Sequence, residues 1–219
     1  MNAARRPLAV APVRRTRARR GEGDRLREEI LAAAERMLIE SGDESVLSIR
    51  RIADAVGVTP PSIYLHFADR NELIFAVCEE QFRHLDEAME AAVAGLDDPM
   101  ERLRARGRAY IEFGLGNPEH YRILMMGRPD NTPERFVDER LSHTAAFGHV
   151  AGDVALAIAA GEIGPDDAVL VACGLWIAVH GLTSLLITKP DFPWPDRALL
   201  IDHVLSVLVA GLAAGRPAR

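Results

Sequence analysis

The stretch Ser48–Leu73, SIRRIADAVGVTPPSIYLHFADRNEL, constrains the fold more than any other part of the chain. Its apolar residues recur at helical spacing in two short runs, so the sequence predicts two short helices joined by a tight turn. The first helix carries Ile52, Ala53 and Val56 on one face, and the second carries Ile63 and Phe67. We expect Ile52, Val56, Ile63 and Phe67 to be core residues.

The residues between the two runs have the properties that such a turn requires. Gly57 stands where the first helix must stop, in a position suited to a left-handed residue. Thr59 can cap the second helix, and Pro60 then occupies its first position, where a missing N–H costs nothing. This is the helix-turn-helix pattern, in which the second helix enters a DNA major groove.

The same stretch resembles the DNA-binding core of the TetR family of transcriptional regulators. That family's pattern combines a Ser/Thr before the helix pair, Ile-Ala, Ala-x-Gly-Val, a further Ser/Thr, Tyr-x-His-Phe, a basic residue and Glu-Leu. Arg70 stands where the family usually has lysine, and Pro61 stands where it often has glycine. The residues that fit are Ser48, Ile52, Ala53, Gly57, Val58, Thr59, Tyr64, His66, Phe67, Glu72 and Leu73.

The predicted DNA contacts fall into two groups. The resemblance implies that Ser48, Thr59, Tyr64, His66 and Arg70 bind phosphates, which sets register without reading sequence. Away from the core, the second helix presents side chains suited to thymine methyl contacts and one or two hydrogen bonds: Pro60, Pro61, Ser62, Leu65 and His66. Arg50 is the best candidate for a guanine contact, with a phosphate contact as the alternative. For Tyr64 the alternative is a core aromatic.

Charge is distributed unevenly along the chain. Residues 1–75 carry 13 Arg and 11 Asp/Glu, whereas the remainder carries 13 Lys/Arg and 21 Asp/Glu. A basic N-terminal part and an acidic remainder suit a protein whose N-terminal part contacts phosphate. Residues 1–23 are rich in arginine and lack a hydrophobic period, so we expect a disordered arm. The arm either reaches phosphates or a minor groove, or is a solvated tail.

The remaining sequence predicts an all-α protein. We expect an N-terminal three-helix helix-turn-helix domain over residues 24–73 and a larger helical-bundle ligand-binding and dimerisation domain over residues 74–219. Asp69 and Glu72 form a capping box for the helix that follows the helix pair. The helices expected from residue 100 onward begin at or directly after a proline. The expected helices span residues 24–41, 69–94, 100–115, 118–126, 133–160, 165–188 and 195–214.

A second resemblance covers residues 109–126 and 175–185. They look like the C-terminal ligand-binding domain of a TetR subgroup marked by Trp-x-x-x-His-Gly, here Trp176, His180 and Gly181. The resemblance implies a pocket for a small apolar or amphipathic effector among the aromatic and methionine residues. Its expected walls are Phe113, Met125, Phe147 and Trp176, although such residues are often plain core. His180 orients a polar ligand atom, or is a buried histidine bonded to a helix carbonyl.

Residues 168–188 form an uncharged stretch that, with the last helix, has more apolar surface than one small bundle covers. A two-fold dimer with a four-helix seam would bury it. The predicted dimer residues are a small-residue strip, Gly174, Ala178 and Gly181, together with Val204, Leu205 and Leu208. The stretch is also long enough to cross a bilayer, but its flanks lack a one-sided basic cluster.

Signals for other kinds of function are weak. Cys78 and Cys173 suggest no disulfide framework, and the N-terminus lacks the apolar core of a secretory signal, so we expect a cytoplasmic protein. No nucleophile turn, phosphate loop, Cys-x-x-Cys or Glu-x-x-His motif occurs, so we expect no enzyme activity, cofactor or metal.

The leading hypothesis is a homodimeric, ligand-responsive repressor on a pseudo-palindromic double-stranded DNA operator. The alternatives are a small-molecule-binding or enzymatic helical bundle with a vestigial helix-turn-helix, and a membrane-anchored regulator.

Overall fold

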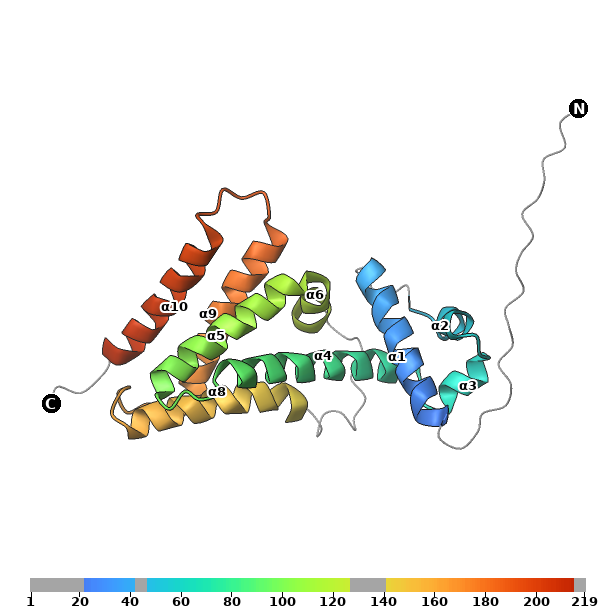
Figure 1. Cartoon of the computed structure of the whole chain (residues 1–219), viewed down its shortest axis with the longest axis horizontal. Coiled ribbons are helices and arrows are strands. Elements are labelled where there is room, and N and C mark those ends of the chain that lie inside the picture. The colour runs from blue at the N-terminus through green and yellow to red at the C-terminus, as the bar shows by residue number, and fades with distance from the viewer. Residues whose placement is uncertain (1–21, 42–46, 127–140, 215–219) are drawn as a thin grey trace, which may run out of the picture. The chain divides into compact units, whose positions relative to one another are not determined.

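The structure is a computed structural model that describes residues 22–41, 47–126 and 141–214 (Figure 1). Every regular element in these residues is a helix, which confirms the predicted all-α fold. The chain divides into two compact units between Val77 and Cys78. This boundary falls inside α4 (Arg70–Ala92), so one continuous helix contributes to both units.

The first unit contains α1 (Glu22–Ser41), α2 (Ile49–Val56), α3 (Pro60–Tyr64) and the first turns of α4. Apolar side chains of α1, α2, α3 and the residues after α3 are buried in it, including Ile30, Leu38, Ile52, Ile63 and Phe67. Val56, expected in the core, is only partly buried. These helices form the predicted helix-turn-helix domain.

Local capping explains where the short helices begin and end. Ser48 Oγ accepts a hydrogen bond from Arg51 N at 3.2 Å and so caps α2. Gly57 has a φ of 72°, and this left-handed conformation ends α2 as predicted. Thr59 occupies the N-cap position of α3, before Pro60, but its side chain makes no capping hydrogen bond. Its hydroxyl lies 3.3 Å from Ser62 Oγ instead.

The second unit contains the rest of α4 and the later helices. They are α5 (Pro99–Gly116), α6 (Pro118–Met126), α8 (Leu141–Ala159), α9 (Ala168–Thr188) and α10 (Arg197–Ala214). α5 contacts α6, α8, α9 and α10, so it is the central helix of this bundle (Figure 1). Two clusters of buried apolar residues surround it: one joins α4, α5, α6, α8, α9 and α10, and the other joins α5, α8 and α9.

Helix starts agree with the prolines only in part. α5 and α6 begin at Pro99 and Pro118 as predicted. The expectation is wrong for α9 and α10, which begin at Ala168 and Arg197. An aspartate determines each of these starts, because its carboxylate accepts hydrogen bonds from backbone N–H groups of the first turn. Asp167 accepts from Val169 N and Leu170 N, and Asp196 accepts from Leu199 N. Residues 133–140 of the helix expected from 133 to 160 lie outside the described residues.

The capping box predicted at the start of α4 is present. Glu72 N donates to Asp69 Oδ1 at 2.8 Å, and the Glu72 carboxylate accepts from the backbone N–H of Ala68. Arg70 Nε also donates to the carbonyl of Leu47 at 2.8 Å. These bonds connect the first turn of α4 to the segments on either side of the helix pair, and so hold α4 within the first unit.

Candidate DNA-binding and effector sites

Helix α3 has one buried and one exposed side. Ile63 and the following Phe67 are fully buried, whereas Tyr64 is 53% and Leu65 84% exposed. The exposure of Tyr64 shows that it is not a core aromatic. An apolar side chain as exposed as Leu65 is suited to contact with a thymine methyl group. The other predicted contacts on this helix and its flanks are exposed or partly exposed: Thr59, Pro60, Pro61, Ser62 and His66.

The remaining predicted DNA contacts, Arg50, Ser48 and Arg70, differ in whether they also make hydrogen bonds within the protein. Arg50 is exposed on α2 and is available to a base or a phosphate. Ser48 is the cap of α2, and Arg70 is hydrogen-bonded to the Leu47 carbonyl, so both also have a structural function. A DNA contact by any of these residues stays a prediction. The arginine-rich arm, residues 1–23, lies almost wholly outside the described residues.

A polar cluster lies among the apolar side chains of the second unit. It joins Tyr110 on α5, Tyr121 on α6, and Trp176 and His180 on α9. Tyr121 Oη lies 2.6 Å and Tyr110 Oη 3.3 Å from His180 Nδ1, and the two hydroxyls lie 3.2 Å apart. Trp176 Nε1 donates to Tyr110 Oη at 3.3 Å. We refer to these four residues as the Tyr–His cluster.

The protonation of the Tyr–His cluster follows from its burial. Burial lowers the pKa of His180 and raises the pKa values of Tyr110 and Tyr121, so all three are neutral at physiological pH. A neutral imidazole carries one N–H, and its position follows the direction of the Tyr121 bond: where Nδ1 accepts from Tyr121, the proton is on Nε2. In that tautomer the Nε2–H has no partner among the described residues and is a donor that a ligand could use.

The expected pocket walls lie around the Tyr–His cluster. The rings of Phe147 and Trp176 meet edge to face, with centroids 6.3 Å apart. Phe113 and Met125 are partly buried against the apolar cluster that includes both tyrosines. The His180 ring is bonded to tyrosine hydroxyls, not to a helix carbonyl as the alternative held.

Sequence reasoning did not identify Tyr110 and Tyr121 as polar partners of His180. The three residues come from three helices, and their separations along the chain, 70 and 59 residues, have no periodic relation to each other. The only signal is local: both tyrosines lie in the stretch 109–126 that carries the second resemblance.

The predicted dimer residues are mostly accessible. Gly174 is exposed, and Ala178, Gly181, Val204 and Leu208 are partly buried. Leu205 is an exception, because it is 2% exposed inside its own bundle and is therefore not available to a partner subunit. Large apolar side chains that are at least 48% exposed lie on the two helices: Val169, Leu170, Ile177 and Leu185 on α9, and Leu199 and Val207 on α10.

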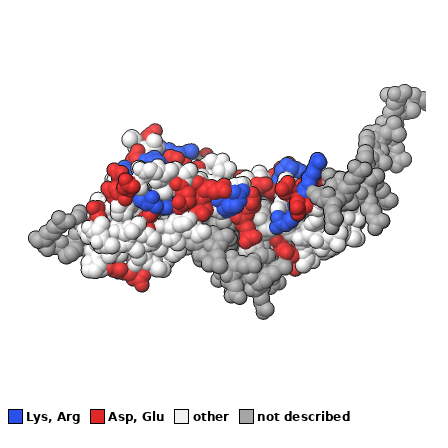
Figure 2. Space-filling view, turned by 60° about the horizontal axis from the view of Figure 1, so that its bottom comes forward, with Lys and Arg blue, Asp and Glu red and all other residues white. Residues whose placement is uncertain are grey.

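The distribution of surface charge and the composition of α9 and α10 bear on the predicted dimer surface. On the face of the second unit seen in Figure 2, acidic side chains form a band beside an uncharged area. By length and composition alone, α9 and α10 could cross a membrane, but the core helices of soluble proteins pass the same test.

Comparison with known proteins gives two family matches. Residues 30–77 match the family described as "Bacterial regulatory proteins, tetR family", and residues 103–208 match "Tetracyclin repressor-like, C-terminal domain". The first match contains the helix-turn-helix, and the second contains the Tyr–His cluster. The subgroup marked by Trp-x-x-x-His-Gly stays a prediction.

Individual relatives agree with these matches. An uncharacterized HTH-type transcriptional regulator of Mycobacterium tuberculosis is 26% identical over 87% of this chain and 89% of its own. The HTH-type transcriptional activator FasR of Mycolicibacterium smegmatis is 30% identical over 46% of each chain. A solved structure from Rhodococcus sp. RHA1, of unknown function, is 28% identical with a TM-score of 0.71, over 87% of this chain and 95% of that one. The chain therefore belongs to the TetR family of DNA-binding transcriptional regulators.

Proposed function

We propose that this regulator is a homodimeric repressor that a small apolar or amphipathic molecule releases from a pseudo-palindromic operator. The observation that carries the effector half of the proposal is the Tyr–His cluster, a set of neutral hydrogen-bonding groups surrounded by aromatic and aliphatic side chains. Such surroundings suit a ligand with an apolar body and one polar atom. By binding preferentially to the DNA-incompetent state, the ligand would shift the population away from the operator.

The DNA half is tested with the intergenic DNA upstream of the protein's own coding sequence, because such regulators often control neighbouring genes. We expect a shift of this DNA at near-physiological salt, with a scrambled duplex of equal length as the control. Equal affinity for the two duplexes would contradict the proposal, since phosphate contacts alone do not distinguish sequences.

Arg50→Ala tests the source of sequence preference. If Arg50 reads a guanine, its loss weakens operator binding by about 1–3 kcal/mol and relaxes preference at one base position. Arg36→Ala, which removes another exposed arginine from the first unit, is the matched control for loss of charge. Fluorescence anisotropy on operator and scrambled DNA measures both affinities. Equal losses on the two duplexes would make Arg50 a phosphate contact.

The effector site is tested through the fluorescence of Trp176. The chain has two tryptophans, so Trp194→Phe leaves Trp176 as the only tryptophan emitter. We expect a compound that releases the operator to change this emission, and Tyr121→Phe or His180→Gln to weaken its effect. A releasing compound that leaves the emission unchanged and acts equally on both variants would place the effector site elsewhere.

Activation is a second candidate mode, since FasR, which is 30% identical over 46% of each chain, is named an activator. A transcriptional reporter behind the bound DNA decides between the two. Removal of the gene raises reporter expression if the protein represses and lowers it if the protein activates.

We also propose that the protein acts in the cytoplasm and by binding alone, without catalysis. Family membership supports this, because the matched relatives are transcription regulators. It also disfavours a vestigial helix-turn-helix and a membrane-anchored regulator. Purification of a monodisperse, DNA-binding protein without detergent is the expected result.

A further inference from the structure

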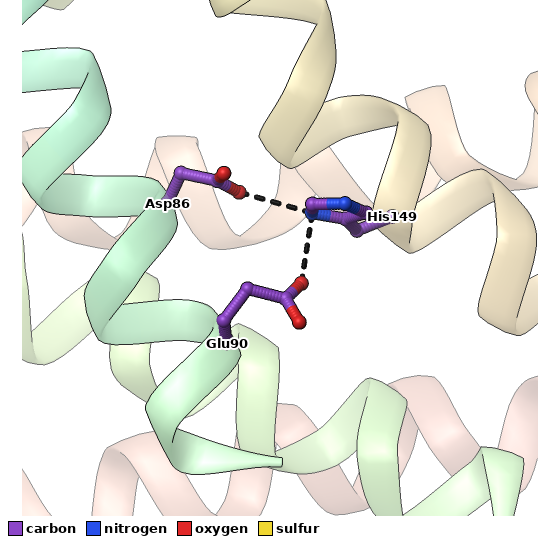
Figure 3. A group of neighbouring side chains, drawn as sticks. All are labelled: Asp86, Glu90 and His149. Carbon is purple, nitrogen blue, oxygen red and sulfur yellow. Dashed lines mark hydrogen bonds and ion pairs between the residues drawn. The ribbon is translucent and has the colours of Figure 1, made fainter. Parts of the chain in front are cut away.

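A group of side chains apart from both sites described above joins α4 to α8 within the second unit. Asp86 and Glu90, one turn apart on α4, point toward the ring of His149 on α8 (Figure 3). His149 Nδ1 lies 3.0 Å from Asp86 Oδ1 and 2.8 Å from Glu90 Oε1. One ligand atom from each residue lies within 4.8 Å of the other two. We propose that these residues bind a divalent transition-metal ion of the Zn²⁺ type.

The donor set suits such an ion. Carboxylate oxygen and imidazole nitrogen are both common zinc ligands, and three protein ligands leave a fourth position for water. Ligand atoms around one tetrahedral Zn²⁺ lie about 3.3 Å from each other. The present separations of 2.8 Å and 3.0 Å therefore require only small side-chain adjustments. His149 is 44% exposed, so an ion can reach the group from solvent.

Buried charges behind the group hold one ligand in place. Arg106, 2% exposed, donates from Nη1 at 2.7 Å to Glu90 Oε1, the oxygen that also faces His149 Nδ1, and from Nε to Asp153 Oδ2 at 2.6 Å. Arg102 Nε donates to the other Asp153 oxygen at 2.7 Å. Such hydrogen bonds from outer residues fix the orientation of metal ligands.

The balance of charge in this network favours a bound cation. Its three carboxylates and two guanidinium groups leave one net negative charge while His149 is neutral. Asp86 carries this excess, because among the described residues its partner is His149 alone. A proton on His149 is the competing cation, since it would form an ion pair with each carboxylate.

The test uses the full-length protein, freed of metal with a chelator and titrated with Zn²⁺ at about pH 7.5, above the ordinary histidine pKa. Affinity is measured by competition with a chromophoric chelator, and thermal unfolding is followed with and without Zn²⁺. We expect one Zn²⁺ per chain and a rise in Tm on binding. His149→Gln and Asp86→Asn should each weaken binding by about tenfold or more, since even outer-shell changes cost that much.

Two control variants remove similar groups that lie outside the proposed site. Glu87→Gln removes a carboxylate from the same helix, and His203→Ala removes an exposed histidine from α10, so both should retain the wild-type affinity. Equal Zn²⁺ affinity in the wild type and His149→Gln would overturn the proposal. The absence of Zn²⁺ binding to the wild type would overturn it as well.

Discussion

At the scale of single residues, Arg106 is a buried cation that pairs with two carboxylates, Glu90 and Asp153. Its side chain is 2% exposed, and that of Asp153 is 3% exposed. Removing the guanidinium would leave the Asp153 charge buried with Arg102 alone and Glu90 without its cation. The cost of breaking a buried pair comes mainly from the charge that stays behind.

We therefore expect Arg106→Met to lower the free energy of unfolding by about 3–5 kcal/mol. Arg104→Met is the matched control on the same helix, because Arg104 lies 3.6 Å from Asp202 and both are more than 40% exposed. Its loss should change stability by about 1 kcal/mol or less. Urea unfolding measures the free energy of unfolding of both variants. Similar decreases in the two would contradict a special role for the buried pair.

Because the pKa of His180 is lowered, we expect the free energy of unfolding to depend on pH. Burial lowers its pKa below the ordinary 6.5, so the unfolded chain takes up a proton more readily than the folded chain. The stability contributed by neutral His180 is complete above pH 6.5 and is lost as the pH falls below it. Urea midpoints from about pH 8 to pH 5 should therefore fall less in His180→Gln than in the wild type. The other histidines are common to both proteins, so parallel curves would contradict the prediction.

At the scale of elements, α5, α6 and α9 approach closely at Gly114. A Cβ atom there would lie 2.5 Å from Thr183 Cγ2 on α9 and 2.7 Å from Tyr121 Cδ2 on α6. Only a residue without a side chain allows these three helices to meet at this separation. The same contact positions Tyr121 for its hydrogen bond to His180.

Gly114→Ala should accordingly destabilise the protein by about 1–3 kcal/mol through overpacking. Gly148→Ala on α8 is the matched control, since nothing lies within 4 Å of its added Cβ. That change should stabilise the helix by about 0.5–1 kcal/mol. Thermal unfolding compares the two, and a Gly114 variant as stable as the Gly148 variant would show that the helices can separate without cost.

At the scale of the whole molecule, α9 and α10 retain exposed apolar side chains after the subunit has folded. Ile177 is 68% and Val207 56% exposed, on helices with buried residues on their other sides. Apolar surface of this kind is covered when a second copy packs against it. A four-helix seam would also set the spacing of the two recognition helices.

Ile177→Glu should weaken the dimer by about tenfold or more, equivalent to about 1.4 kcal/mol. The matched control is Leu156→Glu, which places the same charge at a 58% exposed leucine on α8. Sedimentation velocity over a range of concentrations measures the dimer, and circular dichroism checks the fold. If both variants dimerise like the wild type, the seam lies elsewhere.

The sequence by itself determined that the chain is helical and where the helix-turn-helix lies, although the starts of α9 and α10 are set by Asp167 and Asp196 and not by the prolines. Gly57 ends α2, Ser48 caps it, and the period of Ile63 and Phe67 sets which side of α3 is buried, because these signals act between residues a few positions apart. The family resemblance could be found in the single continuous stretch Ser48–Leu73, because it also depends on residues close together in the sequence.

Only the tertiary structure decided which side chains meet across helices. Tyr121 and His180 meet because Gly114 allows α5, α6 and α9 to approach, and Asp86 meets His149 because α4 lies beside α8. Leu205 is buried because its side of α10 faces Gly107 on α5. These contacts depend on the rotation and register of packed helices, which arise from many distant side chains together, and no local pattern in the sequence encodes them.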